Sequence, residues 1–310
     1  MQKLKAAVIG LGEMGQHHAR VYAQMDTVGL VAVCDVDSRK LANITRTWGG
    51  KPYTSHWQML RTEQPDLVSV AVPTVAHFKI VSDCLWAGAH VLVEKPITDT
   101  IKAAQLLINL AKQQKQILAV GHIERCNPIV AAVKRHIDEG DLGRIYRIGT
   151  RRVGPSPERI RDVGCTIDLL THDLDIARFL LQSEPLAYHA ELLHANHGDY
   201  DDAVTAIVRF ENDIIGSFEA DWLSSAKDRV LVITGEQGVL TADYMAQQGV
   251  LEFSPSERVQ ITVPRCEPLR TELEAFAAAA RGEGRPAATG QDGLAALRMA
   301  LQILEAGNGI

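Results

Sequence analysis

Five short and nearly continuous apolar runs lie within the first 122 residues, and stretches of helical periodicity separate them. The runs consist mostly of Val, Ile, Leu and Ala, the composition of strands that are covered on both faces. Alternation of strands and helices at this spacing predicts a parallel, doubly wound sheet with right-handed crossovers. The predicted strands are residues 5–10, 29–35, 65–73, 89–96 and 116–122, and the predicted helices are residues 14–25, 38–48, 75–88 and 100–114.

The pattern changes after about residue 123, where strands begin to follow one another directly. The segment "RFENDIIGSFEA" indicates a hairpin that turns at Glu211–Asp213, and a strand before it is expected to end at a Gly/Pro break, residues 154–157. The run of adjacent strands predicts an open, mostly antiparallel sheet. The remaining predicted strands are residues 186–195, 202–210, 213–222, 228–235 and 250–254, with helices at 127–139, 164–182, 268–281 and 291–306.

The chain has 310 residues, about twice the length of a typical domain, so two domains are expected. The first, residues 1–122, is α/β, and the second, residues 123–310, is α+β with the open sheet. The C-terminal helix can pack back on the first domain.

Composition and charge limit the kind of protein this is. The net charge is −6 and no block of like charge occurs, which argues against nucleic acid as a partner. No run approaches the roughly 20 apolar residues of a membrane span, and the N-terminus lacks the features of a signal peptide. The five cysteines form no C-x-x-C pair, so neither a disulfide framework nor a structural zinc site is indicated. These features favour a cytoplasmic protein without a membrane partner.

Three glycines follow the first strand and open the first helix in the segment "VIGLGEMG". Gly10, Gly12 and Gly15 form G-x-G-x-x-G. The first glycine permits a tight turn, the second lets a pyrophosphate approach the backbone, and the third allows the helix to pack closely on the strand. The phosphates then lie at the positive N-terminus of the helix. The motif is weak alone, but its strand–turn–helix context predicts a dinucleotide site and a Rossmann domain.

Asp35 ends the second strand, 20 residues after Gly15. A carboxylate at this point binds both ribose hydroxyls of NAD and repels the 2′-phosphate of NADP. NAD is therefore the expected cofactor, although Arg39 and Lys40 nearby keep NADP as an alternative.

Two further segments end at the carboxyl edge of the predicted sheet, where ligands bind in open α/β folds. These are "AVPTVAH" (71–77) and "EKP" (94–96). Lys95 interrupts an apolar run at the expected nicotinamide end, and the following proline restricts its backbone to an extended form. Besides Gly10, Gly12, Gly15 and Asp35, the candidate cofactor-binding residues are Glu13, Met14, Val72, Pro73, His77, Glu94 and Lys95.

The segment "DLLTHDLD" (168–175) brings carboxylates and a histidine together. On a helix, Asp168, His172 and Asp175 fall along one stripe, because residues three and four apart share a face. Taken alone, the segment fits a metal site, an acid–base pair or a solvated helix face.

The chain resembles the glucose–fructose oxidoreductase/inositol dehydrogenase family. The matching segments are "VIGLGEMG", "VCDVDSRKLA", "AVPTVAHF", "VLVEKP" and "GCTIDLLTHDLDIARFLL", followed near the end by "TGQDGLAALRMALQILEA". The resemblance implies an N-terminal Rossmann domain and a C-terminal domain with an open antiparallel sheet. In the family that sheet commonly packs against a partner subunit, so a homo-oligomer, either a dimer or a tetramer, is implied.

By this resemblance the catalytic residues are Lys95, Asp168 and His172. Within the family, "GHIERCNP" (121–128) and residues 151–180 look most like the UDP-N-acetylglucosamine 3-dehydrogenases. Those enzymes oxidise the 3-hydroxyl of the sugar, and an aminotransferase then converts the 3-keto nucleotide sugar into a 3-amino sugar for lipid A. The resemblance implies the same NAD-dependent reaction here and a functional link to an aminotransferase.

Oxidation of a secondary alcohol needs a hydride acceptor and a group that removes the hydroxyl proton. His172, with a reference pKa of about 6.5, suits the role of general base. Asp168 would orient the imidazole or share the base role, and Lys95 would stabilise the developing alkoxide. Whether Lys95 or His172 takes the proton stays open, and we favour His172. The hydride passes to the nicotinamide.

A nucleotide sugar also carries a diphosphate, which needs cationic or backbone partners. Arginines gather around the substrate-side motifs, at Arg125, Arg151, Arg152, Arg159 and Arg161. We expect the substrate to contact Arg125, Asn127, Arg152 and Arg161.

Three alternatives compete with this assignment. A metal site is disfavoured, because Asp173 points about 100° away from His172 on a helix and no second ligand cluster is evident. We interpret Asp173 and Asp175 as helix-packing or hydrogen-bonding residues. A non-catalytic dinucleotide-binding regulator would have no need of Lys95, Asp168 and His172 together. A dehydrogenase of a free polyol or sugar such as inositol is the main competing function, against which the arginines argue mildly.

Overall fold

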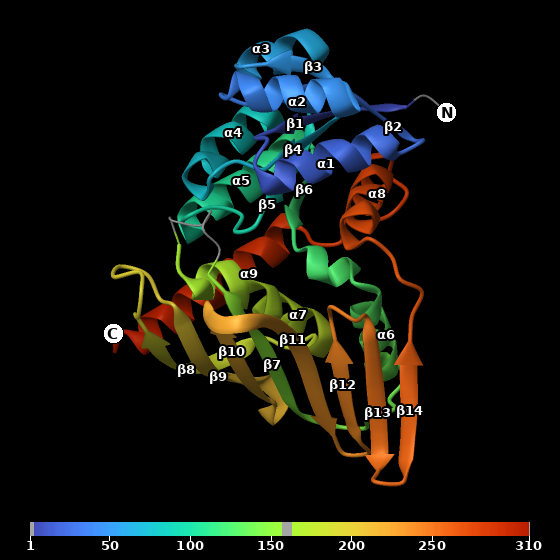
Figure 1. The fold of residues 1–310 in the computed structure, drawn as a ribbon, viewed down its shortest axis with the longest axis vertical. Helices are drawn as coiled ribbons and strands as arrows, with labels where there is room; N and C mark the ends of the chain where they lie inside the picture. Colours follow the sequence, from blue (N-terminus) through green and yellow to red (C-terminus); the bar gives the residue numbers. More distant parts are fainter. Residues whose placement is uncertain (1–2, 157–162, 310) are drawn as a thin grey trace. The chain divides into compact units, whose positions relative to one another are not determined.

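The computed structural model describes residues 3–156 and 163–309. Packing divides the chain into two compact units (Figure 1). The first unit comprises the residues up to Ile123 together with Glu267–Leu294, and the second comprises Glu124–Cys266 and the residues from Ala295 onward. We propose that these units are the two predicted domains, with the segment 267–294 returning to the first.

Within the described residues, the first unit is built on a six-stranded parallel sheet in the order β3-β2-β1-β4-β5-β6. The strands are β1 (Leu4–Ile9), β2 (Val28–Cys34), β3 (Lys51–Tyr53), β4 (Leu67–Val70), β5 (His90–Glu94) and β6 (Leu118–Gly121). The helices between them are α1 (Glu13–Gln24), α2 (Ser38–Trp48), α3 (His56–Glu63), α4 (Thr74–Trp86) and α5 (Ile101–Gln114). The predicted parallel, doubly wound sheet is confirmed.

The sequence prediction missed β3 and α3. β3 has three residues at the edge of the sheet and contains Pro52, which has no N–H to donate and is tolerated at an edge. Two of its three residues are exposed, so it shows no apolar run. In α3 only Met59 and Leu60 are buried, too few to produce a readable helical periodicity.

The core of the first unit receives one helix from a distant part of the sequence. α8 (Pro268–Ala280) packs against α1 within this unit. Leu269, Leu273 and Phe276 lie four and three residues apart, so they share one face of α8, and they join the core that contains Tyr22. The segment 267–294 is thus part of the first unit because it completes the cover over that side of the sheet.

Within the described residues, the second unit has an eight-stranded sheet in the order β14-β13-β12-β11-β7-β10-β9-β8. β7 and β10 pair in parallel and the other neighbouring strands pair antiparallel, so the predicted mostly antiparallel sheet is confirmed. The strands are β7 (Ile145–Pro155), β8 (Pro185–Leu193), β9 (Ala203–Phe210), β10 (Ile215–Asp221), β11 (Leu223–Gly235), β12 (Val239–Asp243), β13 (Gln248–Ser254) and β14 (Glu257–Thr262).

Several helices accompany this sheet. They are the short 3₁₀ helices η1 (Ile123–Cys126) and η3 (Glu211–Asp213), α6 (Pro128–Asp138), the π-helical turn η2 (Thr166–Leu170), α7 (Thr171–Leu181) and α9 (Gly290–Gly307). α9 begins in the first unit and ends in the second. η3 joins antiparallel β9 and β10, which confirms the predicted hairpin at Glu211–Asp213.

Two details of the second unit differ from the prediction. β12 and β14 were not predicted; β14 has one buried residue, Ile261, and therefore lacks an apolar run. The expected Gly/Pro break is wrong in its first residues, because β7 continues through Gly154 to Pro155. Pro155 ends the strand, where a missing N–H is tolerated. The end of that predicted break, Pro157, lies outside the described residues.

One face of the second sheet is the core face. Ile148, Phe210, Phe218, Leu231 and Ile233 are buried on it, in a cluster with apolar residues of α6, α7 and α9. Alternate residues of the same strands point to the opposite face, which we call the outer face.

Candidate active site

The turn between β1 and α1 fits the predicted phosphate site. Gly10 has a φ of +88°, and a Cβ there would lie 2.3 Å from a main-chain oxygen that follows β4. A Cβ on Gly15 would lie 1.8 Å from the oxygen of Gly10, so both glycines are required by the fold. At Gly12 no described atom lies within 4 Å of such a Cβ, and no described side chain caps the helix that starts with Glu13 and Met14. Open space beside uncapped N–H groups suits a pyrophosphate.

Asp35 follows β2 and lies against this turn. Its Oδ2 accepts a hydrogen bond from the Leu11 N–H at 2.6 Å, and its Oδ1 accepts one from the Asp37 N–H at 2.8 Å. Each carboxylate oxygen retains a second lone pair, so the group is held in place and can still accept from ribose hydroxyls. The 2′-phosphate of the alternative cofactor NADP needs a cation here, but the guanidinium of Arg39 is already hydrogen-bonded to the carboxylate of Asp37. The residues around Asp35 therefore fit NAD.

The loops after β4 and β5 are joined by His77. Its ring is buried in α4, with Nδ1 2.9 Å from the Pro96 oxygen and Nε2 2.9 Å from the Val72 oxygen. Burial lowers the pKa of His77, and this outweighs the two carbonyl groups, which favour the protonated ring. Pro73 precedes α4 as its N-cap residue, and Lys95 follows β5. The contacts of His77 described here are with the protein backbone, and its role toward the cofactor stays a prediction.

The helix predicted over residues 164–182 is not regular. Thr166–Leu170 form a π-helical turn, and the α-helix begins only at Thr171. The predicted single stripe assumed an α-helical period throughout, whereas Asp168 lies in the wider turn, so the shared face of Asp168 and His172 stays a prediction. His172 lies in the first turn of α7. Because π turns occur often at functional sites, the irregularity supports a functional role for this segment.

Side chains hold the π turn at both ends. The Oδ2 of Asp201 accepts hydrogen bonds from the N–H and the hydroxyl of Thr166, each at 2.7 Å. At the other end the hydroxyl of Thr171 donates to the Ile167 oxygen at 2.8 Å. A Cβ at Gly164 would lie 1.8 Å from the Asp201 carboxylate, so a glycine is required for this contact. The geometry around Asp168 thus depends on β8–β9 loop residues that are distant in sequence.

Two of the arginines that we expected to meet substrate are bound to carboxylates of α7. The guanidinium of Arg152 is 2% exposed and donates twice to Asp173, at 2.9 and 3.0 Å, and once to Glu124 at 2.9 Å. Arg125 donates twice to Asp175, at 2.6 and 2.7 Å. The interpretation of Asp173 and Asp175 as hydrogen-bonding residues is confirmed.

Arg152 and Glu124 favour their charged forms, whereas burial raises the pKa of Asp173 despite its ion pair with Arg152. Burial acts to lower the pKa of Arg152, but the carboxylates of Asp173 and Glu124 outweigh it and raise that pKa. Burial acts to raise the pKa of Glu124, and Arg152 outweighs it and lowers that pKa. Removing one member of such a buried group would leave the others uncompensated. Arg152 and Arg125 are therefore required for packing α7, whatever they do toward a substrate.

The other predicted substrate contacts are placed as follows. Asn127 caps α6 and donates from its amide to Glu124 and to the Tyr244 oxygen, both at 3.1 Å. Arg161 lies outside the described residues, as does Arg159. The substrate-binding role of Arg125, Asn127, Arg152 and Arg161 stays a prediction.

The structure assigns the predicted catalytic residues to two units. Asp168 and His172 belong to the second unit and Lys95 to the first. The joint action of the three stays a prediction.

A cluster of possible metal ligands lies elsewhere. Among the described residues, His136, Glu139 and Asp141 place their ligand atoms within 4.8 Å of one another at the end of α6. The imidazole Nδ1 of His136 is 2.6 Å from Asp141 and is thus already hydrogen-bonded to it. The cluster contains none of the predicted catalytic residues.

The structure also reveals polar residues that the sequence did not single out. Three such residues are buried, namely His18, Glu124 and Asp201. Their hydrogen-bond partners are Glu94, Arg152 and Thr166, respectively, which lie in or next to the predicted site segments. For His18 a signal was available, because His18 and Tyr22 lie four apart on the buried face of a predicted helix. For Asp201 no local pattern exists, since its partner Thr166 is 35 residues away, and Glu124 binds the distant Arg152 as well as its neighbour Asn127.

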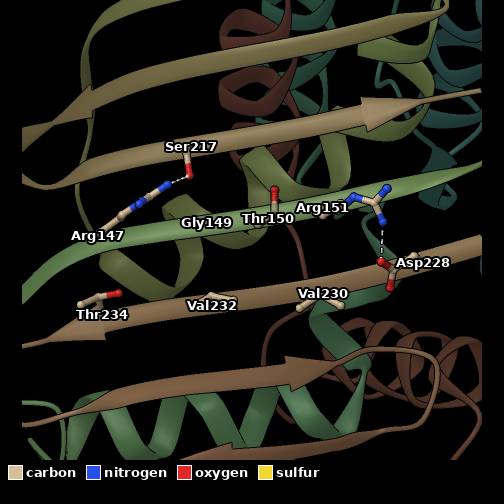
Figure 2. Close-up of a pocket in the computed structure, with 9 residues that line it drawn as sticks. All are labelled: Arg147, Gly149, Thr150, Arg151, Ser217, Asp228, Val230, Val232 and Thr234. Carbon is tan, nitrogen blue, oxygen red and sulfur yellow. Dashed lines mark hydrogen bonds and ion pairs between the residues drawn. The ribbon is translucent and has the colours of Figure 1, made fainter.

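The outer face of the second sheet bears a pocket of about 440 Å³ (Figure 2). Gly149 of β7 lies in it between Arg147 and Arg151, and Ser217 and Val232 lie on the strands to either side. It contains none of the predicted catalytic residues.

Two family models match the chain in succession. Residues 4–122 match the Gfo/Idh/MocA oxidoreductase family with an NAD-binding Rossmann fold, and residues 130–241 match the C-terminal domain of the same family. The chain belongs to the Gfo/Idh/MocA family. It is accordingly an NAD-dependent oxidoreductase, and the predicted family, cofactor and enzyme class are confirmed.

The relatives of this chain include enzymes that are named for different substrates. The chain is 27% identical to a UDP-N-acetylglucosamine 3-dehydrogenase of Acidithiobacillus ferrooxidans, over 79% of this chain and 75% of the relative. It is 29% identical to a scyllo-inositol 2-dehydrogenase of Bacillus subtilis, over 81% of this chain and 77% of the relative. A solved structure of the Acidithiobacillus ferrooxidans enzyme superposes with a TM-score of 0.91 at 26% identity, covering 100% of this chain and 99% of that one.

None of the described helices in this Gfo/Idh/MocA chain combines the length and the apolarity that crossing a membrane requires.

The open space at Gly12 leads to a prediction about NAD. In Gly12→Ala the new methyl group meets no described atom, so the free energy of unfolding should stay near that of the wild type. The methyl group would, however, occupy the approach to the pyrophosphate, and the Kd for NAD should rise about tenfold or more, which is about 1.4 kcal/mol. Isothermal titration with NAD measures this.

Gly29→Ala is the matched control, because Gly29 in β2 also has no described atom within 4 Å of a Cβ. It should bind NAD as the wild type does. An unchanged Kd in Gly12→Ala would contradict the placement of the phosphates.

Proposed function

We propose that this chain oxidises the 3-hydroxyl of UDP-N-acetylglucosamine with NAD and releases the 3-keto nucleotide sugar. The observation that carries the proposal is the match to the Acidithiobacillus ferrooxidans 3-dehydrogenase, which extends over both units at a TM-score of 0.91. A ketone at this position is a substrate for transamination, so an aminotransferase of the lipid A pathway is the proposed functional partner. No disulfide joins the five cysteines within the described residues, which supports the proposed cytoplasmic location.

Each predicted catalytic residue has a proposed role. Bound NAD supplies the hydride acceptor, held by the glycine turn and Asp35. His172 removes the hydroxyl proton, and Asp168, in the π turn just before it, orients the imidazole or shares the proton. Lys95, as an ammonium, stabilises the oxygen as negative charge develops on it.

One observation favours a second candidate, a dehydrogenase of a free polyol. The arginines were the argument for a diphosphate, and the described ones are paired with carboxylates. Arg125 and Arg152 bind Asp175 and Asp173, and Arg151 bonds to Asp228 at 2.5 Å. The similarity to the Bacillus subtilis inositol dehydrogenase supports the same candidate.

A substrate panel decides between the two candidates. The protein is incubated with NAD and, separately, with UDP-N-acetylglucosamine, other UDP-sugars, scyllo-inositol and myo-inositol, and NADH is followed by absorbance. Coupling to an aminotransferase with glutamate withdraws the ketone and should increase NADH from UDP-N-acetylglucosamine. Turnover of inositols without turnover of any UDP-sugar would reject the first proposal in favour of the second.

The proposed catalytic roles predict large kinetic effects. His172→Ala and Lys95→Ala should each lower kcat by about 10²–10⁴-fold, the range for general acid–base groups. His194→Ala serves as the control, because His194 follows β8 in a loop and has no proposed role. Near-normal kcat in both catalytic variants, with circular dichroism unchanged, would contradict the roles.

We further propose that the outer face of the second sheet packs against a second copy of this chain. Pairing across six strands aligns an uncharged row, Ile207, Ser217, Gly149, Val232, Thr241 and Val250. Ile207 is 43% exposed although it is apolar, and the pocket at Gly149 interrupts the row. Arg147 and Arg151 border it with polar partners (Figure 2). An uncharged centre with a polar rim is typical of a subunit interface.

A charge in the centre of this row should prevent assembly. Val232→Asp places a carboxylate on the outer face, where it does not enter the core, and sedimentation velocity should show a shift from oligomer to monomer. Val259→Asp on the exposed strand β14 is the control and should leave the oligomer intact. A wild-type chain that sediments as a monomer at micromolar concentration would reject the proposal.

A further inference from the structure

A buried chain of polar side chains crosses the first unit. His18 of α1 is 0% exposed, with its Nδ1 3.0 Å from the hydroxyl of Ser69 and its Nε2 2.9 Å from Oε1 of Glu94. The hydroxyl of Tyr22 lies 2.9 Å from the same Ser69 oxygen. We call Tyr22, Ser69, His18 and Glu94 the His18 chain. It runs from α1 through β4 to the end of β5.

One arrangement of protons satisfies every group in the His18 chain. Burial raises the pKa of Tyr22, so its hydroxyl stays protonated and donates to Ser69. Ser69 then donates to Nδ1 of His18, and the N–H at Nε2 donates to Glu94. A neutral imidazole with its proton on Nε2 completes the series without an unused donor. Fully satisfied buried networks of this kind fix side chains in one geometry.

Glu94 is the end of the chain and the residue before Lys95. Its carboxylate lies against Gly121 of β6, where a Cβ would come 3.0 Å from Oε2 and would crowd the carboxylate in its present position. Burial acts to raise the pKa of Glu94. The hydrogen bond from His18 and the charge of Lys95 oppose burial, and the pKa of Glu94 lies below its ordinary value.

We propose that His18 is a positioning residue for the oxidation, holding the Glu94 carboxylate in place beside Lys95. The inference rests on the proposed role of Lys95 in the reaction. His18 lies three residues after Gly15, on the helix whose N-terminus is proposed to bind the phosphates. α1 thus links the phosphate turn to the residue that precedes Lys95. Loss of the link affects the chemical step and leaves the phosphate site itself unchanged.

Three variants of His18 separate this role from simple packing. His18→Leu removes the donor to Glu94, and kcat should fall about tenfold or more while the Kd for NAD stays within about twofold. His18→Gln should restore most of kcat, since its amide can donate to Glu94 and its oxygen can accept from Ser69. His18→Asn is too short to reach Glu94 and should behave as the leucine variant does, which keeps the test open if leucine prevents folding.

The neighbouring histidine gives a matched control. His17 is on the same helix but exposed, so His17→Leu should have wild-type kcat and wild-type affinity for NAD.

The pH dependence provides a readout that packing alone would not change. In the wild type, Glu94 titrates below its ordinary value and is ionised near neutrality. Without the donor from His18, burial remains as the largest influence and the pKa of Glu94 rises. Protonation of Glu94 as the pH falls then begins at a higher pH. Because His172 already sets an acid limb, this second protonation should make the fall of log kcat/KM at acid pH steeper in His18→Leu, and it should not do so in His18→Gln.

A measurement without substrate distinguishes failure of this inference from failure of the proposed function. Carboxyl carbon NMR titration of the apo protein should show the pKa of Glu94 higher in His18→Leu than in the wild type. An unchanged titration in a folded variant would overturn the inference even if the enzyme is active. A wild type that oxidises no sugar or polyol would reject the proposed function while the titration still tests the link.

A double-mutant cycle completes the test. Glu94→Gln and His18→Leu should not be additive in kcat, because both remove the same contact. Additive effects would show that His18 acts by another route.

Discussion

All strands of a parallel sheet end at the same edge, and the proposed cofactor site depends on that constraint. β1, β2, β4 and β5 run in one direction, so the glycine turn, Asp35 and the loops that contain Val72 and Lys95 meet at one edge of the first unit. Hydrogen bonds then fix what the topology brings together. Asp35 is bonded to the N–H of Leu11 in the glycine turn, and His77 joins the loops after β4 and β5. Hydrogen bonds therefore join the turn and the loops at this edge to one another.

The second unit is organised by buried charge. Arg152 and Arg125 each bind a carboxylate of α7, and Glu124 shares Arg152 with Asp173. Taking these groups out of water is costly, and it is offset only because each charge has a partner with hydrogen-bond geometry. Arg152 of β7 fixes α7 on the sheet, and Arg125 fixes it to η1. They also weaken the argument for a diphosphate, because a paired arginine is not an open site for an anion.

Two irregular or buried polar features lie next to the predicted catalytic residues. The π turn that contains Asp168 is held by Asp201 and Thr171, and the His18 chain ends at Glu94 beside Lys95. In both cases a residue distant in the sequence fixes the local geometry of a predicted catalytic segment. Pre-organisation by such neighbours is what keeps a reacting group within the narrow range of positions that catalysis tolerates.

The sequence alone determined the doubly wound sheet, the glycine turn with Asp35, and the segments that carry Lys95, Asp168 and His172. These depend on local patterns: apolar runs, glycine spacing and residues next to strand ends. The sequence did not reveal β3, β12 or β14, because short or exposed strands have no apolar run. It also did not reveal the π turn or the partners of the arginines. The pairing of Arg152 with Glu124 and Asp173, and of Thr166 with Asp201, joins residues 21 to 35 positions apart. Only the tertiary structure decides such contacts, because no helical or strand period relates the two positions. A buried polar group bonds to whichever partner the fold brings beside it.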